Sequence, residues 1–247
     1  MHDIRYDAIH DEFLVVNPFA QAVLVFRGGA NGEEAPVRVI QGPRTELAGT
    51  TVAGLDRLDV DPVHGEIVVP NGDSILVFPR EANGDVAPLR IIQGPDTQLQ
   101  ATRAIAVDPI HNLIIIGDFG GSTGRDEGRG NLAIFGRTDN GNVKPRAVIK
   151  GPNTGLTSIS QIQVSAAKGW IVVTHPSDQS EPEPEGIFVG IWSINDNGDV
   201  PPHWMIGGPK SQLKKPRGVA LNPKDKELIV ADMRLNAVLT YYFPEIF

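Results

Sequence analysis

Short apolar runs alternate with polar turns along this chain, and the same pattern returns about every 50 residues, the period expected of a repeat protein. Four segments align without gaps, and they begin 52, 57 and 57 residues apart. They read NGEEAPVRVIQGPRTEL from Asn31, NGDVAPLRIIQGPDTQL from Asn83, NGNVKPRAVIKGPNTGL from Asn140 and NGDVPPHWMIGGPKSQL from Asn197. No stretch of helix length shows a 3.6-residue apolar period, so the pattern predicts an all-β chain.

Two more elements recur between these segments. A polar turn followed by a β-branched run reads RYDAIHDEFLVVN from Arg5, DVDPVHGEIVVPN from Asp59, AVDPIHNLIIIGD from Ala106, QVSAAKGWIVVTH from Gln163 and ALNPKDKELIVAD from Ala220. A shorter apolar run then ends in an aromatic residue, at Phe26, Phe78, Phe135, Trp192 and Tyr241. Each unit therefore predicts four strands: a before the polar turn, b after it, c ending in the aromatic residue, and d running into Gly-Pro.

Four short strands per unit of about 50 residues predict a β-propeller of four-stranded antiparallel blades. We expect a single domain over 1–247, with units at approximately 4–50, 51–100, 101–157, 158–214 and 215–247. The fifth unit stops after strand c and has no segment for the outer strand d. The alternative is a six-bladed ring with one blade outside this chain.

The units resemble NHL repeats, and RGVALNPKDKELIVADMRLNAVLTYY from Arg217 carries the resemblance most fully. It implies a relation in fold to the six-bladed propellers of the gluconolactonase and strictosidine-synthase group, a scaffold that hosts lactonases, lyases and binding modules alike. The resemblance also favours an extracytoplasmic location in bacteria. The chain begins MHDIRYDAIHDE, which has no apolar stretch of the signal-peptide kind.

The longest predicted loops fall on one face of the blades. In an antiparallel blade the b–c loops and the d–a connections share a face, and the long ones are 118–131, 175–186 and 46–54. Loops that grow on one face of a repeat array commonly mark its binding face. The candidate partner-binding residues are Phe119, Arg125, Asp126, Glu127, Arg129, Asp178, Glu181, Glu183 and Glu185.

A polar residue ends strand b in every unit, and these five residues are candidates for a ligand ring at the channel mouth. They are Asn17, Asn71, Asp118, His175 and Asp232. An oxygen-rich set with one imidazole suits Ca²⁺ or another divalent cation, with Asp118, His175 and Asp232 as the metal candidates. The structural alternative is that each residue caps the turn that follows it.

Composition removes several function classes. The net charge is −8, from 22 Lys and Arg against 30 Asp and Glu, which argues against nucleic-acid binding. No apolar run is long enough to span a bilayer, although docking on a membrane complex stays open. The absence of Cys excludes thiolate chemistry. The recurring Asp-x-x-His at His10, His64 and His111 is interpreted as a turn, and Gly120–Gly124 as a chance match to the esterase motif G-x-S-x-G.

The leading hypothesis is a non-catalytic NHL-like propeller that binds another protein, either through its long-loop face or through the unpaired edge of its last blade. It could serve as an accessory subunit of a larger assembly. One alternative is a lactonase-like, metal-dependent hydrolase or lyase that uses Asp118, His175 and Asp232. Another is a carbohydrate-binding module, for which Phe19 and Phe119 supply loop aromatics.

Overall fold

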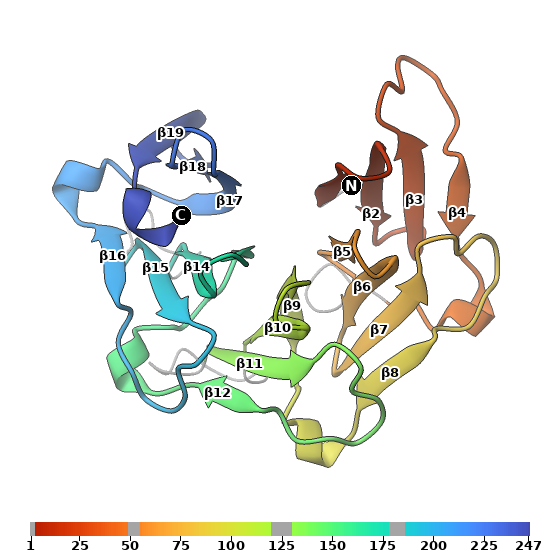
Figure 1. Ribbon diagram of the computed structural model, residues 1–247, viewed down its shortest axis with the longest axis horizontal. Helices are drawn as coiled ribbons and strands as arrows, with labels where there is room; N and C mark the ends of the chain where they lie inside the picture. The colour runs from red at the N-terminus through yellow and green to blue at the C-terminus, as the bar shows by residue number, and fades with distance from the viewer. Residues whose placement is uncertain (1–2, 49–54, 120–129, 178–185) are drawn as a thin grey trace. The chain divides into compact units, whose positions relative to one another are not determined.

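The repeated pattern folds into five antiparallel sheets, seen in a computed structural model that describes residues 3–48, 55–119, 130–177 and 186–247. Each sheet follows chain order, from the inner strand to the outer one (Figure 1). Four sheets have four strands and the last has three. The fold is therefore an all-β propeller type with five blades, as the sequence predicts.

The strands match the expected positions closely. Blade 1 comprises β1 (Ile4–Asp7), β2 (Glu12–Asn17), β3 (Ala22–Arg27) and β4 (Arg38–Ile40). Blade 2 comprises β5 (Asp59–Asp61), β6 (Glu66–Asn71), β7 (Ser74–Pro79) and β8 (Arg90–Gln93). Blade 3 comprises β9 (Thr102–Asp108), β10 (Leu113–Asp118), β11 (Asn131–Gly136) and β12 (Ala147–Ile149). Blade 4 comprises β13 (Gln161–Ser165), β14 (Trp170–His175), β15 (Phe188–Ser193) and β16 (Trp204–Gly207).

Blade 5 comprises only β17 (Pro216–Asn222), β18 (Glu227–Asp232) and β19 (Ala237–Tyr242). The helical elements of the described residues are short 3-10 turns. Four of them follow the Gly-Pro of the outer strands: η1 (Pro43–Thr45), η2 (Pro95–Thr97), η3 (Pro152–Thr154) and η4 (Pro209–Ser211). The fifth, η5 (Pro244–Ile246), follows β19, where an outer strand would otherwise begin. Within the described part of the chain, no helix has the length and apolar character needed to cross a membrane.

Two compact units divide the chain, one formed by 1–114 with 136–144 and the other by 115–135 with 145–247. In the first unit, apolar side chains of blades 1 and 2 form one core cluster, which includes Leu14 and Val23 from blade 1 and Ile67 and Phe78 from blade 2. In the second unit, blades 4 and 5 form another, which includes Val189 and Leu228. In both units, burial of apolar surface between facing blades supplies the main stabilisation.

Each Asn-Gly turn of blades 2 to 4 holds the outer strand of the blade before it. In blade 2, the side-chain oxygen of Asn83 accepts a hydrogen bond from the Val39 N–H at 3.0 Å. The Gly84 N–H donates to the Val39 carbonyl at 2.6 Å. Asp85 accepts the Arg44 N–H, at the start of η1, at 2.7 Å. We call this three-residue arrangement the Asn-Gly clasp.

The clasp recurs at Asn140–Asn142 and Asn197–Asp199. Asn140 accepts the Ile91 N–H at 3.0 Å, and Asn197 accepts the Val148 N–H at 2.9 Å. The central glycines of the three clasps have φ values of +76°, +74° and +82°, a left-handed conformation that favours glycine. The sequence predicts these turns correctly, and the structure adds that they join one blade to the next.

A buried ion cluster lies beside the first clasp. The Glu12 carboxylate accepts two hydrogen bonds from Arg38 of its own blade, at 2.8 and 2.7 Å, and one from Arg80 of blade 2 at 2.8 Å. The hydrogen bonds from Arg38, more than those from Arg80, hold the pKa of Glu12 below its usual value. The same cluster recurs between Glu66, Arg90 and Arg137.

Aromatic rings take these positions between blades 4 and 5. The Trp170 and Trp204 rings meet edge to face, with centroids 4.7 Å apart, and Phe243 meets Trp204 in the same way at 6.0 Å. By alignment of the repeats, the three rings stand where the first interface has Glu12, Arg38 and Arg80. One position in the blade interface is thus filled by ions in one unit and by aromatic rings in the other.

Candidate functional site

The five polar residues of the predicted ring stand where the sequence places them, at the last position of each b strand. Asn17 ends β2, Asn71 ends β6, Asp118 ends β10, His175 ends β14 and Asp232 ends β18. Among the residues that the structure describes, no three or more His, Asp or Glu side chains gather in a way that could hold a metal ion. The contacts of the individual side chains show what they do instead.

Asp232 is a backbone cap with all its acceptor directions in use. One carboxylate oxygen accepts the N–H groups of Lys214 and Lys215, both at 2.8 Å. The other accepts those of Arg234 and Leu235, both at 3.1 Å. The side chain therefore joins the connection that enters blade 5 to the turn that leaves β18, and it is only 2% exposed.

His175 has the same role with different chemistry. Its Nδ1–H donates to the Gly186 carbonyl at 2.8 Å, while Nε2 accepts the N–H groups of Thr157 at 3.0 Å and Ser158 at 3.2 Å. Its ring stacks on Phe188 with centroids 4.5 Å apart. Burial lowers the pKa of His175 to about 4, so the ring is neutral at pH 7. Both ring nitrogens are engaged by the protein's own backbone.

Asn71 makes the third link of this kind. Its side-chain oxygen accepts the Ala48 N–H at 2.8 Å, and its amide donates to the Glu46 carbonyl at 3.1 Å. Asn17 caps its own turn, accepting the Ala20 N–H at 3.3 Å. Asp118 is buried at the end of β10. The capping alternative thus describes Asn17, whereas at Asn71, His175 and Asp232 the caps also reach the preceding connection, which sequence reasoning missed.

Most of the candidate loop residues cannot be placed. Phe119 directly follows β10 and is partly buried. The other candidates lie outside the described residues: Arg125, Asp126, Glu127, Arg129, Asp178, Glu181, Glu183 and Glu185. The long-loop face consequently remains a prediction from the sequence.

The recurring Asp-x-x-His motif forms a turn, as expected. In the first copy, one oxygen of Asp7 accepts the N–H groups of Ile9 and His10, and the other accepts the His10 Nδ1–H at 2.7 Å. Asp61 with His64 and Asp108 with His111 repeat the arrangement. Each imidazole is held by the aspartate of its own turn, which accounts for the motif without a ligand.

The open edge of blade 5 differs from every other blade. Val238, the second apolar position of β19, is 66% exposed. Its four equivalents are fully buried: Val23, Ile75, Leu132 and Val189. Two positions further along, Thr240 is exposed and Tyr242 is 71% exposed. A face that is core in four blades is therefore presented to solvent in the fifth.

The backbone of β19 is open along the same edge. In each complete blade, the fourth position of strand c uses its carbonyl to accept an N–H from the residue just before the outer strand. The four pairs are Val25 with Val37, Val77 with Leu89, Ile134 with Arg146 and Ile191 with His203, all at 2.7 or 2.8 Å. The equivalent carbonyl in β19 belongs to Thr240. Because alternate residues of an antiparallel strand point their N–H and C=O to the same side, Val238 and Thr240 present theirs at this edge.

The composition of β19 also sets it apart from the other edge strands. Each outer strand follows a proline by two residues, namely Pro36, Pro88, Pro145 or Pro202. Proline near an edge strand and arginine within it are devices that discourage pairing with another chain. β19 reads AVLTYY, with high β propensity, no charge and no proline. It is an unprotected edge.

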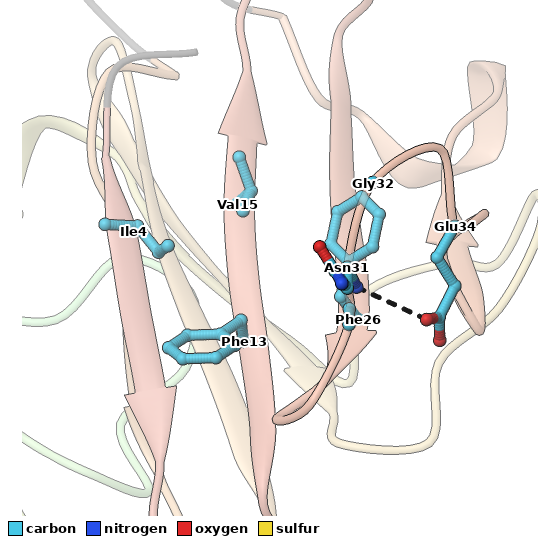
Figure 2. A pocket seen from close by; sticks show the side chains of 8 residues that line it. Ile4, Phe13, Val15, Phe26, Asn31, Gly32 and Glu34 are labelled. Atoms are coloured by element: carbon cyan, nitrogen blue, oxygen red, sulfur yellow. Dashed lines mark hydrogen bonds between the residues drawn. The ribbon is translucent and has the colours of Figure 1, made fainter.

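A second exposed apolar surface lies on blade 1. A groove of about 230 Å³ is lined by side chains of β1, β2 and β3, namely Ile4, Phe13, Val15 and Phe26, and by the turn Ala30–Gly32 with Glu34 (Figure 2). Figure 2 shows the Asn31 N–H donating to Glu34 beside it. The blade 2 equivalents of the apolar lining all belong to the core packed against blade 1: Leu58, Ile67, Val69, Phe78 and Ala82. The groove is therefore a blade-receiving face.

The geometry as a whole shows polar strand ends committed to the backbone and two apolar blade faces open to solvent. Neither the models of known protein families nor the curated proteins compared with this chain match it.

Proposed function

We propose that this chain is a non-catalytic, NHL-like β-propeller that binds another protein, as an accessory or scaffold subunit, through the open edge of blade 5. The observation that carries the proposal is the exposure of β19 at positions buried in every other blade, with Val238 at 66% and its four equivalents at zero. Exposed apolar patches on a folded protein commonly mark interaction sites.

The state of the polar strand ends supports a binding role over catalysis. A metal-dependent hydrolase needs ligand atoms free to face a cation, or a base with its pKa near neutrality. His175 offers neither, since both its nitrogens bond to the backbone and its pKa lies at about 4. Asp232 is held by four N–H groups. These side chains stabilise the blades.

Photo-crosslinking in the cells that naturally express the protein tests the proposal. Val238 is replaced with p-benzoylphenylalanine, and the matched control places the same residue at Ile110, which is similarly exposed at 61% but lies in a turn. We expect a defined protein adduct at position 238 that disappears when Tyr242→Asp is added. Absence of an adduct, the same adducts at position 110, or adducts insensitive to Tyr242→Asp would overturn the proposal.

The variants must stay folded for the test to be informative. Val238→Asp and Tyr242→Asp change exposed positions, so the unfolding free energy is expected to stay within about 0.5 kcal/mol of the parent value. Circular dichroism and urea unfolding of each purified variant check this directly.

A further inference from the structure

We infer that the occupant of the β19 edge is an extended segment of another polypeptide with the pattern Pro-x-x-x-Ile-x-Gly-Pro-x-Thr/Ser-x-Leu, which completes blade 5 as its outer strand. This inference rests on the proposed function and names the chemistry of the partner at that site. Strand addition to an exposed sheet edge is a general mode of recognition, in which backbone bonds give affinity and side-chain positions give specificity.

The chain itself supplies four worked examples of the occupant. The pattern is met at 36–47, 88–99, 145–156 and 202–213. In each case the segment pairs with a strand c whose alternation of side chains β19 shares: Ala22–Arg27, Ser74–Pro79, Asn131–Gly136 and Phe188–Ser193. What these four strands bind predicts what β19 binds.

The isoleucine of the pattern determines where the partner sits. It lies directly opposite the second apolar position of strand c, in the pairs Val23 with Ile40, Ile75 with Ile92, Leu132 with Ile149 and Val189 with Ile206. Ile40, Ile92 and Ile149 are fully buried there. At β19 the opposite position is Val238, so a partner isoleucine would cover the most exposed part of the apolar face. Cross-strand pairs of this kind stabilise a sheet by direct contact.

The Gly-Pro-x-Thr/Ser part explains why an arbitrary β strand would fit less well. The glycine adopts φ between +130° and +136° at Gly42, Gly94 and Gly151, which side-chain-bearing residues rarely adopt. The Thr hydroxyl then closes the 3-10 turn on the glycine carbonyl at 2.6 or 2.7 Å. This turn brings back the final leucine, which is buried in all four segments: Leu47, Leu99, Leu156 and Leu213.

The proline at the start has a separate effect. It cannot donate a backbone hydrogen bond, and the residue after it supplies the N–H that strand c accepts. In blade 2 that donor is Leu89, whose N–H bonds to the Val77 carbonyl at 2.8 Å. At β19 the acceptor is the Thr240 carbonyl. A partner of this pattern therefore meets the open edge with a donor where the edge has an acceptor.

Peptide binding to the full chain tests the inference. The probe is a fluorescent peptide with residues 88–99, PLRIIQGPDTQL, and its matched control carries Ile92→Asp. We expect saturable binding of the probe, at least tenfold weaker binding of the control peptide, and at least tenfold weaker binding of the probe to Val238→Asp protein. Val63→Asp protein, altered at an equally exposed position (64%), is expected to bind as the parent does.

Residue-resolved hydrogen exchange locates the bound peptide. Slower exchange is expected at the amides of Val238 and Thr240, which face the open edge, and little change at Leu239 and Tyr241, which face β18. Failure of the probe to bind up to about 1 mM, the weak end of specific association, overturns the inference. Equal binding of both peptides, equal binding to Val238→Asp protein, or self-association of the chain through β19 does so as well.

The two proposals fail in different ways. A specific cellular adduct at position 238 together with no binding of the probe would keep protein binding by blade 5 and reject the strand-d pattern of its partner. Binding of the probe without any cellular adduct would support the recognition chemistry and reject the proposed cellular role.

Discussion

The interface between blades 1 and 2 and the interface between blades 4 and 5 have the same backbone design but different chemistry at the same three positions. The first holds Glu12 between Arg38 and Arg80, all largely buried. The second holds Trp170 against Trp204, with Phe243 beyond. Both arrangements fill the space with flat groups that pack face or edge. The difference shows that the blade geometry does not depend on which chemistry fills this position.

The two solutions should differ in how they fail. A buried ion cluster is strongly destabilised when one partner is removed, because the remaining charges lose their compensation. An aromatic cluster loses contact area and leaves no charge unpaired. The predictions below use this contrast, beginning with the largest effect.

Removing the shared carboxylate should have the largest effect. Glu12→Ala leaves Arg38 and Arg80 close together without a counter-charge, at an expected cost of about 3–5 kcal/mol in unfolding free energy. Replacing all three residues with their blade 4 and 5 counterparts, as Glu12→Trp, Arg38→Trp and Arg80→Phe, should recover most of that loss. Urea unfolding measures both, and a triple variant no more stable than Glu12→Ala would show that the two chemistries are not exchangeable.

Acid should weaken the two units in different pH ranges. The folded pKa of His175, about 4, lies below its unfolded value of 6.5, so its contribution is complete above pH 6.5 and is lost as the pH falls. The loss should reach about 3 kcal/mol near pH 4. Glu12 also has a lowered pKa, so its contribution is present above its unfolded pKa of 4.5 and is lost only below that value.

His175→Asn provides the control for this pH dependence, because Asn is the residue that blades 1 and 2 use at the same position. Its unfolding free energy should change little between pH 6.5 and 5, whereas that of the parent falls. Urea unfolding across pH values separates the two, and parallel curves would contradict the role given to His175.

The clasps should give a smaller, position-dependent effect. Asn83→Ala removes a hydrogen bond to the outer strand of blade 1 and is expected to cost about 1 kcal/mol. Asn31→Ala changes the equivalent asparagine of blade 1, which is exposed beside the open groove, and should cost less than about 0.5 kcal/mol. Thermal unfolding compares them, and equal losses would mean that the clasp adds nothing to the turn itself.

Chelation should have the smallest effect of all. Since His175 and Asp232 spend their ligand atoms on backbone N–H groups and one carbonyl, EDTA should leave the unfolding midpoint of the protein unchanged. A lowered midpoint, reversed by Ca²⁺ but not by Na⁺, would support the divalent-metal hypothesis for the channel mouth.

Local structure could be predicted from the sequence where it depends on neighbours in the chain. The strands, the Asn-Gly turns and the short fifth blade follow from periodicity and turn chemistry. The partners of Asn83 do not, because its side chain bonds a residue 44 positions earlier. The ligand ring was plausible for a related reason, since polar strand ends look alike whether they bind a ligand or cap a connection that enters from elsewhere.

The aromatic cluster, by contrast, had a signal that could have been found. Aligning the repeats shows that Glu12, Arg38 and Arg80 are replaced together in the later units, by Trp170, Trp204 and Phe243. Three charged residues replaced jointly by three aromatic residues indicate a shared contact. The exposure of β19 was likewise implied by the missing fourth segment, although the depth of burial at its four equivalents required the structure.

The Asn-Gly clasp has a consequence for how such a chain could grow. Every internal unit carries both halves of the joint, an Asn-Gly turn that faces backward and a Gly-Pro turn that the next unit holds. A duplicated unit inserted between two others would find both halves ready, with no compensating change in its neighbours. Blade number in this architecture can thus change by copying whole units, and the near-identical segments at Asn31, Asn83, Asn140 and Asn197 are what such a history would leave.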